Sequence, residues 1–221
     1  MEAKIICTIG PSSIDKNILQ LMKINGMSIG RVNTKYGDEN QWNEIVNNLR
    51  ELKIDVLIDI KSDKYIDWVK TINPDYLAVS FAETVSQLKQ YKIILKDTKI
   101  IAKIESEKGF KNFKNLLKYS SGMMVARGDL SRSVSLEKVP SIQRKILAYC
   151  NSQKKMSIVA TEMLLSMVEK KYPTNAEVND VYMASILKAS CVMLSEETAV
   201  GRYPDLAVMW MSKILNESKR K

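Results

Sequence analysis

Short apolar runs alternate with longer amphipathic stretches along the whole of this 221-residue chain. The apolar runs are rich in Ile, Val and Met and nearly continuous, which is typical of parallel strands buried on both faces. They predict strands over residues 4–8, 27–33, 56–61, 76–81, 99–105, 122–129, 156–163 and 191–197. The amphipathic stretches predict helices over residues 18–23, 39–52, 85–96, 110–119, 141–151, 176–188 and 206–216.

Eight predicted strands that alternate with helices indicate the α/β class and a parallel barrel rather than a sandwich. We therefore expect a (β/α)8 TIM barrel. Single barrels commonly reach this length, and no linker-like segment divides the chain. One barrel domain over residues 1–221 is the expected organisation.

Composition narrows the class of protein. No apolar stretch approaches the roughly 18 residues of a membrane span, and the amino end, MEAKIICTIGPSS, lacks the apolar region of a signal peptide. We expect a cytoplasmic protein with no membrane association, whose three cysteines (Cys7, Cys150 and Cys191) are packed thiols. The net charge of +9 comes from lysines spread along the chain without aromatic clustering, which disfavours nucleic-acid binding and favours an anionic substrate or an acidic partner protein.

Polar side chains end seven of the eight predicted strands, and in such a barrel the carboxyl ends of the strands form the active site. Any one of these residues alone would be read as a strand end that meets solvent, but the whole ring indicates a site. The chain has no histidine, so acids and bases must come from other side chains or from water relayed by a hydroxyl. The ring consists of Arg31, Asn33, Asp59, Lys61, Ser80, Lys103, Glu105, Arg127, Asp129, Thr161, Glu162 and Ser195.

Two carboxylates follow neighbouring strands. Glu105 and Asp129 supply the few hard oxygen ligands that Mg²⁺ or Mn²⁺ needs, with water and substrate oxygens completing the shell. Lys103 would lie near that cation and near Arg31, so we expect its ammonium form to be disfavoured, which suits proton transfer or stabilisation of transferring charge. The alternative is a salt bridge from Lys103 to Glu105. Gly128 lets the backbone approach a ligand, and the amides that follow it can hold a carboxylate or a phosphate.

Eight stretches together resemble the barrel domain of the pyruvate kinase family over nearly all 221 positions: KIICTIGPSS, GMSIGRVN, IIAKIES, SGMMVARGDL, EKV, IVATEML, PTNAEVNDV and VMLSEETAVGRYP. The resemblance implies a phosphoenolpyruvate-binding or pyruvate-binding barrel that uses a divalent metal. It assigns the metal to Glu105 and Asp129, the phosphoryl and enolate centre to Lys103, and phosphate contact to Arg31. A proton relay is assigned to Thr161 and Ser195. The residues expected to bind the substrate are Ser80, Ala126, Arg127, Gly128, Asp129 and Thr161.

Two large departures from that family are visible. In VLIDIKSDKYIDW the third strand passes into its helix within a few residues, where the resemblance predicts an inserted lid domain. The chain also ends after the eighth helix, so the family's carboxyl-terminal domain is expected to be absent. A closing lid usually excludes water and clamps both partners of a phosphoryl transfer, so its loss makes full kinase activity less expected.

Smaller departures surround the predicted site. The family's potassium ligands correspond here to Asn33, Lys35, Asp59 and Ile60, so two are kept. Lys35 is either a fixed ammonium that replaces potassium or a solvent-facing lysine, and we expect no K⁺ requirement. Tyr36 stands at a histidine position. Glu162 and Glu196 stand where the family has a glutamine and a glycine. Each is either an additional general acid or base or a solvated residue at the rim of the mouth, and we favour the rim.

Three functions follow from these residues. The first is a Mg²⁺-dependent, lyase-type enzyme that stabilises the enolate of a pyruvate-like acid. Its reaction would be a decarboxylation, or the cleavage or formation of a C–C or C–O bond. An acidic carrier protein could present the substrate. The second is a reduced pyruvate kinase. The third is a non-catalytic metabolite-binding module. The oligomeric state is open, a homo-oligomer included.

Overall fold

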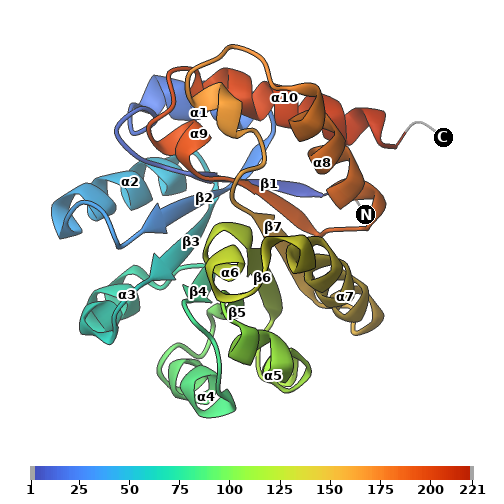
Figure 1. Ribbon diagram of the computed structural model, residues 1–221. Helices are drawn as coiled ribbons and strands as arrows, with labels where there is room; N and C mark the ends of the chain where they lie inside the picture. Colours follow the sequence, from blue (N-terminus) through green and yellow to red (C-terminus); the bar gives the residue numbers. More distant parts are fainter. Residues whose placement is uncertain (1–2, 220–221) are drawn as a thin grey trace.

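The computed structural model describes residues 3–219, which form one closed barrel of eight parallel strands in chain order (Figure 1). The (β/α)8 prediction is therefore confirmed. The expected domain bounds of 1–221 include residues 1–2 and 220–221, which lie outside the described residues. The strands are β1 (Lys4–Thr8), β2 (Met27–Asn33), β3 (Asp55–Ile60), β4 (Tyr76–Val79), β5 (Lys99–Ile104), β6 (Gly122–Ala126), β7 (Met156–Ala160) and β8 (Cys191–Leu194).

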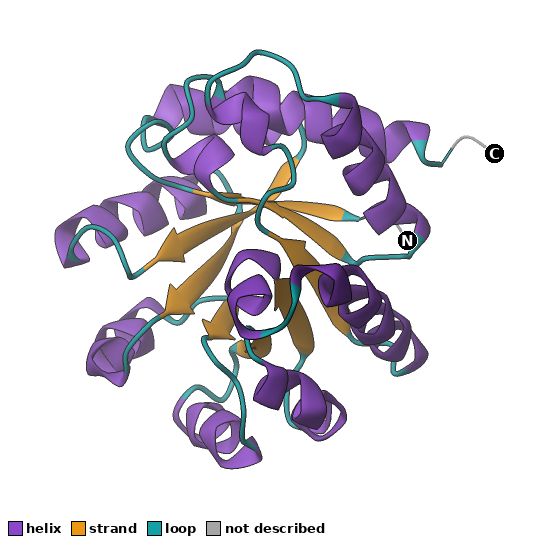
Figure 2. Ribbon diagram, in the orientation of Figure 1, coloured by secondary structure: helices purple, strands orange, loops and turns teal. Residues whose placement is uncertain are grey.

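Helices surround the strands on the outside of the barrel (Figure 2). Those of this outer layer are α1 (Lys16–Ile24), α2 (Glu39–Glu51), α3 (Ile66–Ile72), α4 (Val85–Ile94), α5 (Glu107–Lys118), α7 (Val139–Ser152), α8 (Asn175–Ile186) and α10 (Pro204–Glu217). Two short helices, α6 (Arg127–Ser133) and α9 (Glu196–Ala199), directly follow β6 and β8 at their carboxyl ends. Three 3₁₀ turns complete the set: η1 (Asp63–Tyr65), η2 (Leu136–Lys138) and η3 (Leu165–Val168).

The prediction was wrong about where several strands end. The apolar runs over 122–129, 156–163 and 191–197 continue past the ends of β6, β7 and β8, because the segments that follow also bury apolar side chains, such as Leu130 and Met163. After β7 the chain turns sharply, since Thr161 and Glu162 adopt left-handed backbone angles, with φ of 71° and 54°. These turns, rather than continued strands, form the mouth of the barrel.

Two apolar layers hold the fold together. Along β5 the side chain of Ile101 belongs to the core inside the barrel, whereas Ala102 and Ile104 belong to the core between the barrel and the helices. Alternate residues of a strand point to opposite faces, so Lys103 and Glu105 must face inward, on the same side as Ile101. The alternation of the sequence thus directs both charged side chains into the barrel.

The three cysteines are buried and unpaired, which confirms that they are packed thiols. Burial raises the pKa of the Cys191 thiol to about 12, with a small opposing effect from Lys4. No described helix is both long and apolar enough to pass through a lipid bilayer.

Candidate active site

A layer of charged side chains lies directly above the apolar layer inside the barrel. Three inward-facing residues of the inner core are each followed, two positions later, by a charged residue. Ile29 is followed by Arg31, Leu57 by Asp59 and Ile101 by Lys103. The period of two therefore carries β2, β3 and β5 from an apolar inner layer to a charged one. Barrel closure, rather than sequence proximity, brings these three side chains together.

The charged layer is a network of short ion pairs. Arg31 donates from Nη2 to Asp59 Oδ2 at 2.7 Å and from Nε to the same oxygen at 3.1 Å. The ammonium of Lys103 lies 3.0 Å from Asp59 Oδ2 and 2.9 Å from Glu105 Oε1. Ser80 Oγ accepts a hydrogen bond from Lys103 at 3.1 Å. The four charged side chains are at most 8% exposed, so Asp59 is the central counterion of a nearly dry cluster.

The cluster shifts the pKa of Asp59 and of Lys103. Burial alone would raise the pKa of Asp59, but the charges of Lys103, Arg31 and Lys61 outweigh it and hold this pKa well below its usual range. Burial alone would lower the pKa of Lys103, but Asp59 and Glu105 outweigh it, so this pKa is raised. Among the protein's own groups, the expectation that the ammonium form of Lys103 is disfavoured is therefore wrong, because two carboxylates contact Lys103. The salt-bridge alternative is the one that the structure shows.

A cavity of about 530 Å³ opens above this cluster at the mouth of the barrel. Asp59, Ser80 and Arg127 are not among its lining residues, whereas most of the predicted site residues are. The predicted residues that line it are Arg31, Asn33, Lys35, Lys61, Lys103, Glu105, Ala126, Gly128, Asp129, Thr161, Glu162, Ser195 and Glu196.

Glu105 and Asp129 both line this cavity, at the ends of the neighbouring strands β5 and β6. Oε2 of Glu105 accepts the backbone N–H of Phe81 at 2.6 Å. Its Oε1 contacts Lys103 as an ion pair that lacks hydrogen-bond alignment, and it has no hydrogen-bond partner among the described residues. The Asp129 side chain is 38% exposed, with Arg132 at 3.6 Å.

These two carboxylates fit a Mg²⁺ ion. Among the described residues, no group of three or more His, Cys, Asp or Glu side chains is arranged to hold a metal. Magnesium does not need one, because it is usually bound through one or two carboxylates together with water and substrate oxygens. Glu105 and Asp129 line the same cavity and match that donor set, with the ammonium groups of Lys103 and Lys61 2.9 and 3.7 Å from Glu105 Oε1.

Arg127 does not turn its guanidinium into this cavity. It donates to the backbone oxygen of Thr161 at 3.2 Å from Nε and to that of Glu162 at 3.0 Å from Nη2, and it pairs with Asp180 at 2.6 Å. The predicted place of Arg127 in the substrate site, as part of the segment from Ala126 to Asp129, stays a prediction that does not involve the guanidinium in this arrangement. Arg127 instead holds the left-handed turn after β7 in place.

Thr161 and Ser195 carry the hydroxyls of the cavity wall. Thr161 Oγ1 accepts the backbone N–H of Gly128 at 3.0 Å. A Cβ on Gly128 would lie 3.6 Å from that oxygen, which is an ordinary van der Waals contact. Ser195 Oγ is buried and has no hydrogen-bond partner among the described residues. Both hydroxyls are therefore available to a bound molecule or to water.

The outer residues of the mouth are exposed. The Lys35 ammonium lies over the ring of Tyr36, 5.3 Å from its centroid, and no contact of Lys35 with Asp59 is found among the described residues. The solvent-facing alternative for Lys35 thus matches the structure better than the potassium surrogate. Glu162 and Glu196 are also exposed, as expected for rim residues.

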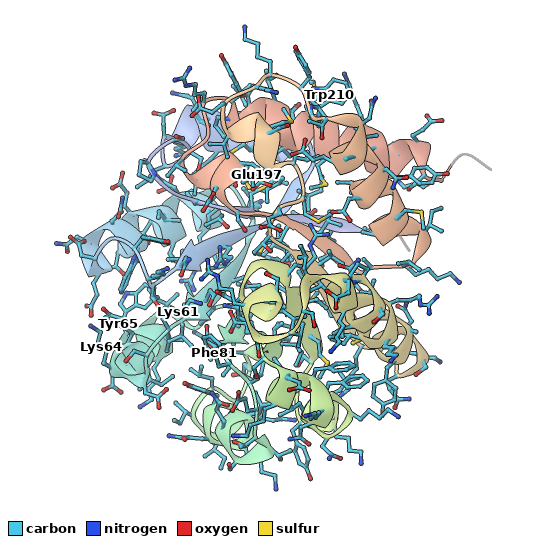
Figure 3. All side chains as sticks on the ribbon, in the orientation of Figure 1. Lys61, Lys64, Tyr65, Phe81, Glu197 and Trp210 are labelled. Atoms are coloured by element: carbon cyan, nitrogen blue, oxygen red, sulfur yellow. The ribbon has the colours of Figure 1, made fainter. Side chains whose placement is uncertain are left out.

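Two site residues were missed from the sequence. Thr8 Oγ1 accepts a hydrogen bond from Arg31 Nη1 at 2.7 Å and donates to the backbone oxygen of Leu194 at 3.0 Å, so it orients the guanidinium. Glu197 is fully buried and accepts the backbone N–H groups of Leu164 and Ser195 at 3.0 and 2.7 Å. Figure 3 shows Glu197 on α9, and Lys61 and Phe81 on the β3–β4 side. A carboxylate inside an apolar run was the signal for Glu197.

Known proteins resemble the chain over most of its length. The family model "Pyruvate kinase, barrel domain" matches residues 54–208. A pyruvate kinase of Dictyostelium discoideum is 44% identical over 151 residues, which cover 66% of this chain and 30% of that protein. One of Methanocaldococcus jannaschii is 37% identical over 172 residues, covering 76% and 38%. "Pyruvate kinase, cytosolic isozyme" of Nicotiana tabacum is 39% identical over 167 residues, covering 74% and 33%. The matched part is thus about a third of each relative.

Proposed function

The chain belongs to the pyruvate kinase family, through its barrel domain, and we propose that it binds pyruvate, phosphoenolpyruvate or a related 2-oxo or enol acid and stabilises the enolate. One observation carries the proposal. The ammonium of Lys103, held between Asp59 and Glu105, lies at the floor of a cavity large enough for such an acid. A fixed buried cation stabilises negative charge that develops during a reaction, because it needs no reorganisation when that charge forms.

Glu105 and Asp129 would hold Mg²⁺ or Mn²⁺ in this proposal, since both carboxylates face the cavity. When bound, such an ion polarises a carbonyl oxygen as a Lewis acid. The metal assignment predicts that a Glu105→Gln, Asp129→Asn double variant loses Mn²⁺ binding in calorimetry with oxalate present. Binding as tight as in the parent would contradict it.

The chain's own residues have distinct proposed roles. Lys103 and Arg31 supply positive charge toward the substrate oxygens from the floor of the cavity. The hydroxyl of Thr161, whose oxygen already accepts the backbone N–H of Gly128, donates to the substrate carboxylate. The hydroxyls of Thr161 and Ser195 pass a proton between water and the carbon beside the carbonyl, which is the general acid–base step left to a site without histidine.

Two reactions can follow from an enolate held in this way. Lyase-type chemistry is our first candidate, because only residues 61–65 separate β3 from α3, so no inserted domain follows β3 to close over the mouth. An acidic carrier protein that presents the substrate would suit an open mouth and a net charge of +9. Phosphoryl transfer is the second candidate, and the printed names of the relatives favour it. The name of the tobacco relative supports a cytoplasmic location.

The test is proton exchange beside a coupled kinase assay on the same preparation. We expect Mg²⁺-dependent exchange of the methyl protons of pyruvate or a close analogue in D₂O, followed by proton NMR, with loss in Lys103→Met and Thr161→Val. Lys89→Met, an exposed lysine on α4, is the matched control and should exchange like the parent. Vigorous ADP-dependent turnover of phosphoenolpyruvate would favour the kinase. Metal and oxalate binding without exchange or turnover would favour a binding module.

We also propose that K⁺ is not required. The charge of Asp59 is already balanced by Arg31 and Lys103, and Ile60 offers no side-chain oxygen at a position where the family resemblance implies a ligand. Exchange rates in sodium and potassium buffers should therefore agree. A rise of several-fold on adding K⁺ would contradict this proposal.

A further inference from the structure

Charge is unevenly distributed among the helices that surround the barrel. α4 and α7 contain no aspartate or glutamate, and α5 contains only Glu107 beside its lysines. α8 shows the opposite pattern, with two carboxylates and no cation. Because α4, α5 and α7 lie next to one another around the barrel, most of the net positive charge is on one side of the molecule (Figure 1).

The exposed cations of these three helices mostly lack acidic partners. Elsewhere exposed lysines form ion pairs with carboxylates, as Lys16 does with Glu51 and Lys70 with Asp67. On α5 only Lys108 and Lys111 do so. We call the remaining exposed cations, which form no ion pair among the described residues, the basic face: Lys89, Lys92, Lys114, Lys118, Arg144 and Lys145.

Like charges also approach one another here. The ammonium of Lys155 lies at the end of α5, where it donates to the backbone oxygen of Ser120 at 2.7 Å. Burial lowers the pKa of Lys155, and the charge of Lys92 lowers it further. Cations held near one another repel, so an acidic molecule bound against α4 and α5 would relieve that repulsion.

Two features favour a protein over a nucleic acid as the molecule bound there. Ile93 is 75% exposed on α4, four residues after Lys89 and therefore on the same side of the helix. Such an apolar side chain among cations offers a protein an anchor. The ammonium groups of Lys89 and Lys114 lie over the rings of Tyr119 and Tyr149, 4.7 and 5.6 Å from their centroids, so these ring faces are covered where a single strand would stack its bases.

The basic face adjoins the mouth of the barrel. β5 ends at Ile104 and α5 begins at Glu107, so Glu105 stands in the connection between the charged floor and α5. The connection from β4 to α4 contains Phe81, which is 52% exposed and donates its backbone N–H to Glu105. The amino ends of α4 and α5 therefore lie at the mouth, and a protein bound along these helices would lie beside its opening.

We propose that the basic face binds an acidic protein through a helix that carries carboxylates opposite these cations and an apolar side chain against Ile93. A helix can present both kinds of side chain on one side. The inference deepens the proposed function at one point, the acidic partner that presents the substrate, and it rests on that function only for what the partner carries. Complementary charge speeds such encounters, and salt weakens them.

The probe is a fluorescein-labelled helical peptide of about 20 residues with glutamates and leucines on one side. Its binding is followed by fluorescence anisotropy at about 50 and about 300 mM NaCl. We expect affinity at the lower salt to fall at least about tenfold when Lys89, Lys92 and Lys114 are all replaced by glutamate. Ile93→Ser should weaken binding about threefold to tenfold, because the leucines lose an apolar contact.

A second triple variant is the matched control. It replaces Lys170, Lys171 and Lys213 by glutamate, so it changes the net charge equally at exposed lysines outside the basic face. Two of these also lie over aromatic rings, Lys171 over Tyr203 and Lys213 over Trp210. This variant should bind the peptide within about threefold of the parent, since screening limits the reach of exposed charges.

The outcomes separate the basic face from net charge, from nucleic acid and from the proposed function. Equal losses in the two triple variants, or a scrambled peptide of the same composition that binds as tightly, would overturn the inference. A DNA duplex of about 20 base pairs that binds these lysines more tightly than the peptide would also overturn it. Methyl proton exchange of free pyruvate should be the same in the parent and in the variant of the basic face, because these lysines lie outside the cavity. Peptide binding without exchange in the parent would contradict the proposed function and leave the basic face standing.

Discussion

Two groups of charged residues at the mouth of the barrel differ in burial. The floor group is the cluster of Arg31, Asp59, Lys103 and Glu105, whose side chains are at most 8% exposed and paired at distances of 2.7 to 3.0 Å. The rim group is Lys35, Glu162 and Glu196, which are exposed. Charges in a dry cluster interact strongly and fix one another's protonation, whereas exposed charges are screened by water. The same residue types therefore have different consequences at the two levels.

The largest expected effect comes from the centre of the floor. Asp59→Asn removes the counterion that Arg31 and Lys103 share, so the free energy of unfolding should fall by about 3–5 kcal/mol. Urea denaturation followed by circular dichroism measures it. Asp67→Asn is the control, because that side chain is 86% exposed and pairs only with Lys70 at the surface, so its effect should stay within about 0.5 kcal/mol. Equal effects of the two substitutions would erase the distinction between floor and rim.

The floor also shows what sequence reasoning could and could not supply. The ring of strand ends correctly placed Lys103 and Glu105 together at the mouth, because residues two apart on one strand share a face, which is a local property of that strand. The protonation of Lys103 was predicted wrongly. It depends on Asp59, which comes from β3, and on a distance of 3.0 Å that only barrel closure sets.

For a similar reason, neither the strand ends nor the long-range hydrogen bonds could be predicted from the sequence. The apolar run that contains Thr161 and Glu162 continues through a sharp turn, because Met163 and Leu164 remain buried after β7 ends. Burial alone therefore cannot mark a strand's end. Thr8 gave no signal, since its partner Arg31 lies on the next strand and the carbonyl of Leu194 on the last.

A second prediction concerns Glu197, a buried carboxylate at the edge of the mouth. Glutamine keeps one acceptor oxygen, but its amide NH₂ would face the backbone N–H of Leu164 or Ser195, so Glu197→Gln should cost about 1–3 kcal/mol in unfolding free energy. Cys7 and Glu196 are the other titratable groups that interact with it. Urea denaturation would measure the cost, and a variant as stable as the parent would contradict the buried contact.

The difference in unfolding free energy between the parent and Glu197→Gln should depend on pH, and the pKa of Glu197 sets the sign of that dependence. Burial raises the pKa of Glu197 above its ordinary value, despite its backbone hydrogen bonds, so the folded state keeps this proton to a higher pH than the unfolded chain. The contribution is fully present below the unfolded pKa and is lost as the pH rises through the folded pKa. The stability advantage of the parent over Glu197→Gln should therefore shrink as the pH rises above about 4.3. An advantage that grows with pH would show that the carboxylate form is the one stabilised.

A third and smaller effect is expected at Arg127, which holds the turn after β7 that carries Thr161 and the rim residue Glu162. Lysine keeps a positive charge for Asp180 but cannot bond the backbone oxygens of Thr161 and Glu162 at the same time. We expect Arg127→Lys to lower the free energy of unfolding by about 1–2 kcal/mol. It should also reduce kcat of methyl proton exchange more than it changes KM, because Thr161 is displaced rather than removed. Arg144→Lys, at an exposed residue of α7 outside the cavity, is the control. A rise in KM alone would instead indicate direct substrate contact.

The smallest effect is expected at the rim, where Glu162 and Glu196 line the cavity but face water. Isosteric replacement of both by glutamine removes two negative charges and leaves the shape of the mouth unchanged. Exposed charges contribute little, so unfolding free energy should change by less than about 0.5 kcal/mol per residue, and the rate of methyl proton exchange should stay within about twofold. The same NMR assay measures it across pH. A fall of tenfold or more, or the loss of one limb of the pH profile, would instead make one of these carboxylates the acid or base of the reaction, and the division between a working floor and a solvated rim would no longer hold.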